Sequence, residues 1–219
     1  MDWAAPVDNY CERMSPEFWA EPANAVSNLA FIVAALLVWP RIKGDREAKA
    51  LTCVLFAIGI GSALFHTVAN RWSALADVLP ILLFILIYLN LATQRVLALP
   101  RWAAWAAMPL FFPYAAGASW LVSLLGGPMN GSTGYVAVAM LIAGFASLAR
   151  RRDPKTARGL ALAAIVLSVS ILLRSVDMAV CGAFPIGTHF LWHALNGALL
   201  GWMIHLISSA RLAKPTGGR

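Results

Sequence analysis

Long apolar stretches alternate with short polar segments along the whole chain. Seven of these stretches approach the roughly 20 residues that a helix needs to cross the hydrocarbon core of a bilayer. They are Ala23–Trp39, Leu51–Val68, Trp72–Thr93, Trp102–Leu124, Thr133–Arg150, Gly159–Val176 and Thr188–Ile207. The pattern predicts an all-α fold, a polytopic membrane protein built as a bundle of seven transmembrane helices.

Prolines interrupt two of these windows. Pro80 lies inside the third, and Pro109 and Pro113 lie inside the fourth. Because proline removes a helical hydrogen bond and crowds the preceding turn, we expect kinks at these positions. The fourth span could even divide into two pieces.

The composition agrees with a membrane protein. The 219 residues are 60% hydrophobic and 12% charged, against roughly 25% charged residues in a soluble domain. We therefore expect an extracytoplasmic N-terminal segment (1–22), one seven-helix transmembrane domain (23–209) and a basic cytoplasmic tail (210–219). The N-terminal segment is acidic and has no basic n-region, so we do not expect it to be a signal peptide.

Basic residues alternate between the predicted loops in a way that sets the orientation. All lysines and arginines except Arg13, Arg71 and Arg174 fall on one side of the predicted bundle. The positive-inside rule places that side in the cytoplasm and the N-terminus outside. The formal net charge of +7 is thus explained by topology, and no nucleic-acid partner is needed. We expect a multi-pass protein of the plasma membrane, or of the inner membrane in a bacterium.

Ionisable residues gather near the outer ends of three predicted helices. His66 ends the second, Asp77 follows the start of the third, and His189 and His193 begin the seventh. At 1.5 Å rise per residue, all four should lie within about 10 Å of the outer boundary. Ionisable groups are expensive at membrane depth, so this cluster predicts a functional site on the extracytoplasmic side.

The spacing of the histidines points to a metal. His189 and His193 are four residues apart, which stacks both rings on one helix face. With His66 they form the ligand set of a catalytic zinc, which lowers the pKa of bound water to about 7. Asp77 could then take and deliver protons, and Ser62, one turn before His66, could reach the metal site or an oxyanion.

The alternative is that each histidine is only interfacial or hydrogen-bonded, which is the common case for a single one. The third histidine and the aspartate at the same depth favour the metal. His205 lies near the inner end of the seventh window, and we give it no role.

Three motifs in order resemble the alkaline ceramidase family over most of the chain. They are an N-terminal stretch with Asp8, Cys11-Glu12, Glu21 and Ser27-Asn28, then Ser62-x-x-x-His66 with Asp77 eleven residues later, and finally His189-x-x-Trp192-His193 with Gly197. The wider superfamily includes the adiponectin and progestin receptors, which carry similar zinc ligands.

The resemblance implies a seven-helix hydrolase that cleaves the amide of a long-chain, ceramide-like N-acyl lipid with zinc. His66, His189 and His193 would hold the metal, with Asp77 as acid and base and Ser62 in support. Trp192, which lies in the last of the three motifs, would contact the membrane lipid substrate.

The resemblance also implies calcium. The family's N-terminal motif usually runs Asp-Trp-Cys-Glu-x-Asn and binds this ion. Here one residue is inserted, Tyr10 replaces the tryptophan and Met14 replaces the asparagine. Asp8, Glu12 and Glu21 still supply three carboxylates, and calcium prefers such oxygen ligands. The alternative is that these acids only cap and solvate the outer mouth of the bundle.

Two cysteines map to the outer side, Cys11 and Cys181, whereas Cys53 maps to the inner end of the second window. Thiols outside the cytoplasm tend to pair, so we expect a Cys11–Cys181 disulfide, with two free thiols as the alternative.

Three other functions compete with hydrolysis. A heptahelical receptor or lipid-binding protein could use the same zinc structurally, and a closed fourth ligand would favour it over an enzyme. A retinal pump is excluded because the seventh window has no lysine for a Schiff base. A transporter would need polar groups at the midplane, whereas here they gather at one end.

Overall fold

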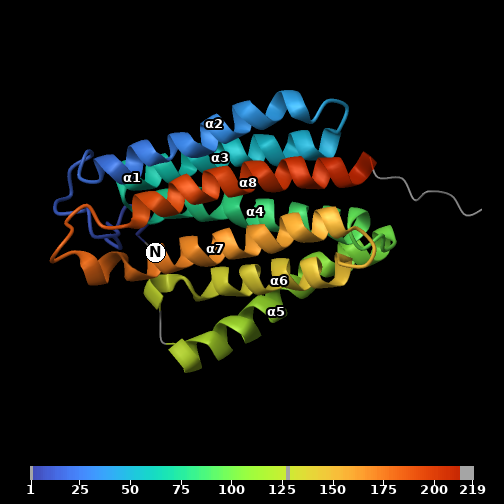
Figure 1. Ribbon diagram of the computed structural model, residues 1–219. Helices are drawn as coiled ribbons and strands as arrows, with labels where there is room; N and C mark the ends of the chain where they lie inside the picture. The colour runs from blue at the N-terminus through green and yellow to red at the C-terminus, as the bar shows by residue number, and fades with distance from the viewer. Residues whose placement is uncertain (1, 127–128, 213–219) are drawn as a thin grey trace, which may run out of the picture.

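The computed structural model describes residues 2–126 and 129–212, and the regular secondary structure within them is helical apart from an isolated bridge between Pro6 and Asn70. The helices run nearly side by side along one axis (Figure 1). Their bounds are α1 Pro22–Ser27, α2 Leu29–Val38, η1 Trp39–Arg41, α3 Arg46–Val68, α4 Arg71–Arg95, α5 Arg101–Gly126, η2 Met129–Gly131, α6 Thr133–Ala149, α7 Pro154–Val180 and α8 His189–Leu212. The predicted tail lies outside the described residues from 213 onward.

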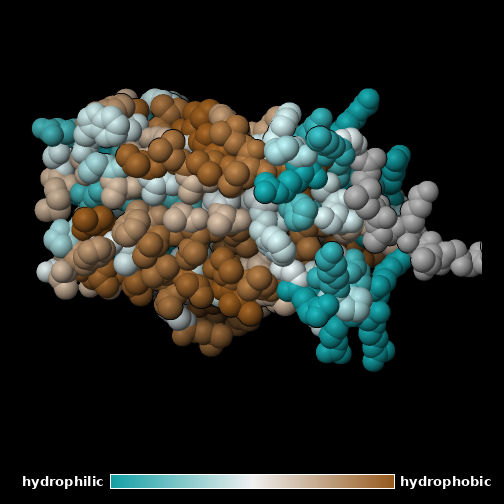
Figure 2. Space-filling model, turned by 45° about the horizontal axis from the view of Figure 1, so that its top comes forward, coloured by the Kyte–Doolittle hydropathy of each residue, from teal (hydrophilic) through white to brown (hydrophobic). Residues whose placement is uncertain are grey.

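The predicted membrane passes correspond to these helices. Six segments are long and apolar enough to span a bilayer, and α6 is a shorter apolar helix of 17 residues. The first pass is the run α1–α2–η1, counted as Pro22–Arg41. Large apolar side chains cover the outside of the bundle, and Figure 2 shows them as a broad brown belt. The chain is thus a multi-pass helical protein of the membrane type.

The fourth window does not divide in two. α5 runs from Arg101 to Gly126 as one helix that contains both Pro109 and Pro113, and α4 likewise continues through Pro80. The possibility of a break is therefore corrected. Membrane helices tolerate proline because neighbouring groups can satisfy the freed backbone carbonyls.

Several helices begin earlier than the apolar windows because polar residues cap them. Asp45 accepts a hydrogen bond from the Ala48 N–H and starts α3 five residues before Leu51. Asp153 does the same for α7 by accepting from the Thr156 N–H. Such side chains satisfy amides that a helix end leaves without a partner.

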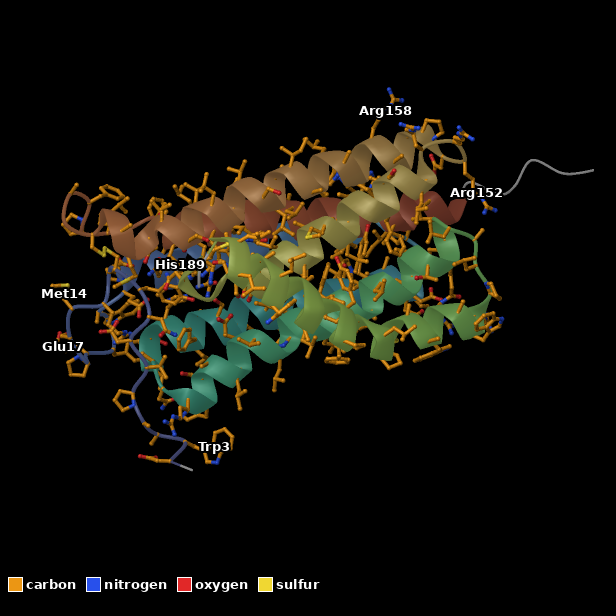
Figure 3. The ribbon with its side chains drawn as sticks, turned by 90° about the horizontal axis from the view of Figure 1, so that it is seen from below. Trp3, Met14, Glu17, Arg152, Arg158 and His189 are labelled. Atoms are coloured by element: carbon orange, nitrogen blue, oxygen red, sulfur yellow. A yellow bond between two sulfur atoms is a disulfide. The ribbon has the colours of Figure 1, made fainter. Side chains whose placement is uncertain are left out.

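The two ends of the bundle differ in charge. Arg152 and Arg158 lie at one end, whereas Met14 and Glu17 of the N-terminal segment lie at the other, the end at which His189 is found (Figure 3). Figure 2 shows hydrophilic side chains crowded at one end of the bundle, next to the broad apolar belt. The separation agrees with the charge asymmetry in the sequence.

Two glycines let helix backbones approach closely near the N-terminal segment. A Cβ on Gly61 of α3 would meet the backbone of Ala76 in α4. A Cβ on Gly197 of α8 would lie 2.7 Å from the backbone of Ala30 in α2. Small residues at helix crossings are typical of membrane bundles. The first crossing brings the Ser62–His66 turn against Asp77.

Candidate metal centre

Three buried imidazoles meet at the end of the bundle that the N-terminal segment covers. His66 comes from the last turn of α3, and His189 and His193 come from the first turns of α8. Their ring centroids are 4.5 to 5.1 Å apart. One ligand nitrogen of each lies within 4.8 Å of the others, and in residues 2–126 and 129–212 no other trio of histidine, cysteine, aspartate and glutamate does so.

Neighbouring oxygens fix two of these rings. Glu21 Oε2 lies 2.6 Å from His66 Nδ1, and Ser27 Oγ lies 2.8 Å from His193 Nδ1. The Ser27 hydroxyl donates its single proton to the Asn24 carbonyl, so it accepts from the histidine. With these hydrogen bonds, both rings carry their proton on Nδ1, and Nε2 is unprotonated.

The remaining nitrogens fit a metal ion. His66 Nε2 and His189 Nδ1 are buried without a hydrogen-bond partner in the described structure. Buried polar atoms are rarely left unpaired, because each costs about 1–3 kcal/mol. Three imidazoles, two of them oriented by an oxygen on the opposite nitrogen, form the donor set that zinc prefers.

Asp77 and Ser62 lie beside the histidines and outside the trio. The Asp77 carboxyl is close enough to the Ser62 hydroxyl for a side-chain hydrogen bond, and it lies near His66. The close crossing at Gly61 produces this arrangement, since Ser62 and Asp77 each directly follow a residue of the crossing.

Asp177 organises the start of α8 and was not predicted. Its buried carboxylate accepts from the N–H groups of Thr188 (2.7 Å) and His189 (2.9 Å). It also accepts from the Cys11 N–H at 2.9 Å. Gly187 precedes this contact with φ at 67°, a conformation that favours glycine. Asp177 therefore ties α7, α8 and the N-terminal segment together.

The expected disulfide is confirmed. Cys11 and Cys181 are bonded, with their Cα atoms 5.5 Å apart. The bond fastens the N-terminal segment to the α7–α8 loop, next to the Asp177 contact. Cys53 is a free, exposed cysteine.

Tyr10 and Arg174 place an aromatic ring and a positive charge beside the histidines, an arrangement that the sequence did not predict. Tyr10 stacks on His189 with the ring centroids 3.7 Å apart. Burial raises the pKa of Tyr10, so it stays neutral. The Arg174 guanidinium lies 5.5 to 5.8 Å from the ring centroids of Tyr10, Tyr135 and Trp192. Neither residue was assigned a role at the histidines, because neither belongs to a histidine or carboxylate pattern.

Trp192 lies where the metal centre meets an apolar cavity. Its buried ring packs edge-on against Tyr135, with the centroids 4.7 Å apart, and it directly precedes His193. Trp192 and Met203 of α8 both line the cavity, together with residues of α4, α6 and α7. Eleven residues of helix correspond to about 16 Å, so the cavity extends deep into the bundle from the site.

The three carboxylates proposed for calcium do not converge. Asp8 is exposed, and Glu12 accepts from the Ala23 and Asn24 N–H groups at the start of α1. Glu21 is paired with Arg13 and His66. Burial would raise the pKa of Glu21, but hydrogen bonds from His66, Arg13 and Asn24 outweigh it and lower the pKa. This geometry does not support a calcium site. Glu12 instead caps the start of α1, as expected if these acids only cap and solvate the outer mouth of the bundle.

One family model matches nearly the whole chain. The model described as Ceramidase covers residues 6–215, which include the histidines, Asp77, Ser62 and the disulfide. No curated protein matches the chain.

Proposed function

Because the chain belongs to the ceramidase family, we propose that it is a zinc-dependent amide hydrolase of the membrane. Its substrate is a long-chain N-acyl lipid of the ceramide type, and its products are a free fatty acid and an amine. The ceramidase family supports a hydrolase acting on an amide bond, and the buried histidine trio supports the metal.

The observation that carries this proposal is the set of three imidazoles with Asp77 and Ser62 beside it. Held by His66, His189 and His193, zinc would supply a Lewis acid for the amide carbonyl and lower the pKa of a water molecule. Within the described residues no fourth histidine, cysteine, aspartate or glutamate joins the trio, which favours an open position over a closed structural site.

Asp77 and Ser62 divide the remaining chemistry. The Asp77 carboxylate takes a proton from the attacking water and returns it to the leaving amine nitrogen. Ser62 orients that carboxyl by hydrogen bonding and can donate to the oxyanion of the tetrahedral intermediate. Water first adds its oxygen to the carbonyl carbon, and the carbon–nitrogen bond breaks once the amine nitrogen has received the proton from Asp77, so one acid and one amine result.

The apolar cavity suits the lipid chain. It begins at Trp192, next to His193, so an amide near the histidines would leave its acyl chain among apolar side chains of α4, α6 and α8. Tyr135 and Arg174 fix the Trp192 ring that separates the polar site from this cavity. Trp192 would therefore contact the substrate at the junction of head and chain.

The same proposal includes orientation. The basic loops at the end opposite His189 favour a cytoplasmic location for that end. The N-terminal segment, the disulfide and the metal centre would then face the extracytoplasmic side of the membrane. A disulfide in this segment agrees with an oxidising compartment.

The test is fatty-acid release from a panel of N-acyl lipids, measured by mass spectrometry on purified protein in lipid nanodiscs. We expect release that a chelator abolishes and that added zinc restores. Folded, zinc-loaded protein that releases no fatty acid from ceramides or other N-acyl lipids would overturn the proposal. Such inactive, zinc-loaded protein would instead favour a heptahelical receptor or lipid-binding protein with structural zinc.

A further inference from the structure

Arg13 is a buried arginine in the N-terminal segment whose guanidinium is surrounded by oxygen atoms. It pairs with Glu21 Oε1 through Nε. Nη1 donates to the Ser15 carbonyl at 3.1 Å and to the Glu17 carbonyl at 3.4 Å, and Nη2 donates to the His66 carbonyl at 3.1 Å. The residue is 7% exposed. Oxygens from the N-terminal segment and α3 thus enclose one fixed positive charge.

Glu21 joins this cation to the metal centre. One carboxylate oxygen faces Arg13 and the other accepts from His66 Nδ1 at 2.6 Å. A buried carboxylate needs a nearby positive charge, because an unpaired buried charge is strongly destabilising. Arg13 therefore balances the carboxylate of Glu21 and keeps it aimed at the imidazole.

Arg13 also holds the other side of the same histidine. The His66 carbonyl belongs to the last turn of α3, where a helix leaves carbonyls without partners and favours a cation. His66 is consequently fixed at its main chain by Arg13 and at its ring by Glu21. A salt bridge serving stability alone would not require contact with both parts of one histidine.

We propose that Arg13 is an internal cation that positions His66 for metal binding through Glu21. Its guanidinium fills this oxygen-lined place, so the N-terminal segment orders the site through a fixed charge of its own. Arg13 is a positioning residue, and this inference rests on the proposed function only in that His66 binds zinc.

The experiment measures zinc affinity by competition with a chromogenic chelator, together with the visible spectrum of the cobalt-substituted protein. Arg13→Met should weaken zinc binding by about 10–100-fold, the usual effect of removing a partner that orients a ligand. The cobalt bands should shift, since the His66 ring turns. Arg71→Met is the matched control, because Arg71 is an exposed arginine at the same end. It should change neither readout.

Two further measurements separate positioning from stability. Guanidinium ion added to Arg13→Ala should restore zinc affinity, whereas sodium at equal ionic strength should not. In a Glu21→Gln background, Arg13→Met should have little further effect, because the carboxylate through which Arg13 acts is gone. This double variant also buries no unpaired carboxylate, so it remains testable if Arg13→Met does not fold.

Wild-type zinc affinity and an unshifted cobalt spectrum in folded Arg13→Met would overturn the inference. So would an unchanged effect of Arg13→Met in the Glu21→Gln background. Failure of the proposed function gives a different result, since the wild-type protein would then bind zinc without releasing fatty acid.

Discussion

The hydroxyl of Ser27 lies 2.8 Å from Nδ1 of His193, although 166 residues separate the two along the chain. Ser27 ends α1 and His193 lies in the second turn of α8. The contact exists because Gly197 lets α8 approach the backbone of Ala30. A hydroxyl on the first membrane pass thus determines which ring nitrogen carries the proton in a histidine on the last pass.

Ser27→Ala should therefore weaken zinc binding without unfolding the protein. The His193 ring loses the acceptor that holds its Nδ1 proton, and removal of such a partner typically lowers metal affinity 10–100-fold. Chelator competition measures the change. Ser123→Ala removes an exposed serine of α5 and should leave the affinity as it is. Equal affinities for the two variants would contradict the role of Ser27.

His193→Ala should abolish stoichiometric zinc binding, because one of the three converging imidazoles is removed. His205→Ala is the natural control, since it removes a histidine of the same helix that lies outside the trio. Elemental analysis of both purified variants provides the measurement. A full zinc content in His193→Ala would show that the ligand set is wrong.

Asp77→Asn should retain zinc and lose on the order of 100-fold or more in the rate of amide hydrolysis, because the proton acceptor is removed. Ser62→Ala should lose less, since Ser62 acts through Asp77 or on the oxyanion alone. Single-turnover assays on zinc-loaded protein compare the two. A larger loss for Ser62→Ala would exchange the roles assigned to the two residues.

The disulfide should stabilise the folded protein. Cys11→Ser frees the N-terminal segment from the α7–α8 loop, and loss of a native disulfide typically costs about 2–5 kcal/mol. The melting temperature in detergent should fall for Cys11→Ser and for wild-type protein treated with reductant. Cys53→Ser should melt as wild type does. Equal melting temperatures for Cys11→Ser, reductant-treated wild type and Cys53→Ser would show that the disulfide does not stabilise the folded protein.

Asp45 should make stability depend on acid pH at the opposite end of the bundle. Both of its carboxylate oxygens bind Arg95, at 2.7 and 3.0 Å. Burial alone would raise the pKa of Asp45, but the hydrogen bonds from Arg95 and the Ala48 N–H lower it to about 2. The unfolded chain has a value near 3.9.

Because the folded pKa is the lower one, Asp45 contributes its full stabilisation above about pH 4, and this is lost as the pH falls toward about 2. The gap in melting temperature between wild type and Asp45→Asn should accordingly narrow below pH 4. Glu17→Gln, a change at an exposed acid, should give no such gap. A gap that persists unchanged down to about pH 2 would refute the assignment.

The histidine trio could be predicted from the sequence because its placement depends on regular helix geometry. Helix rise places His66 and His189 at one depth, and the four-residue spacing places His193 on the same face. The six long apolar helices and the shorter α6 could be predicted for a similar reason, since they follow from the length of each apolar stretch. The boundaries differed because Asp45 and Asp153 extend their helices by capping, which an apolar window does not register.

Residues that act from loops or by pairing were not predictable in this way. No sequence pattern assigned a role to Asp177, and only the folded chain brings its carboxylate to the start of α8. Arg13 was counted merely as an exception to the charge rule. Its pairing with Glu21 removes a carboxylate from the expected calcium set. Such contacts depend on the path of the N-terminal segment, which no periodicity determines.

The distribution of the three clustered histidines along the chain has a consequence for biosynthesis. Domains emerge from the ribosome N-terminal part first. Arg13, Glu21 and His66 are therefore in place long before α8 is translated. A nascent chain stopped before residue 189 contains at most one histidine of the trio, and Cys11 remains without its partner until residue 181 is made. The three histidines can therefore come together only in a finished bundle, and incomplete chains enter the membrane without the complete trio.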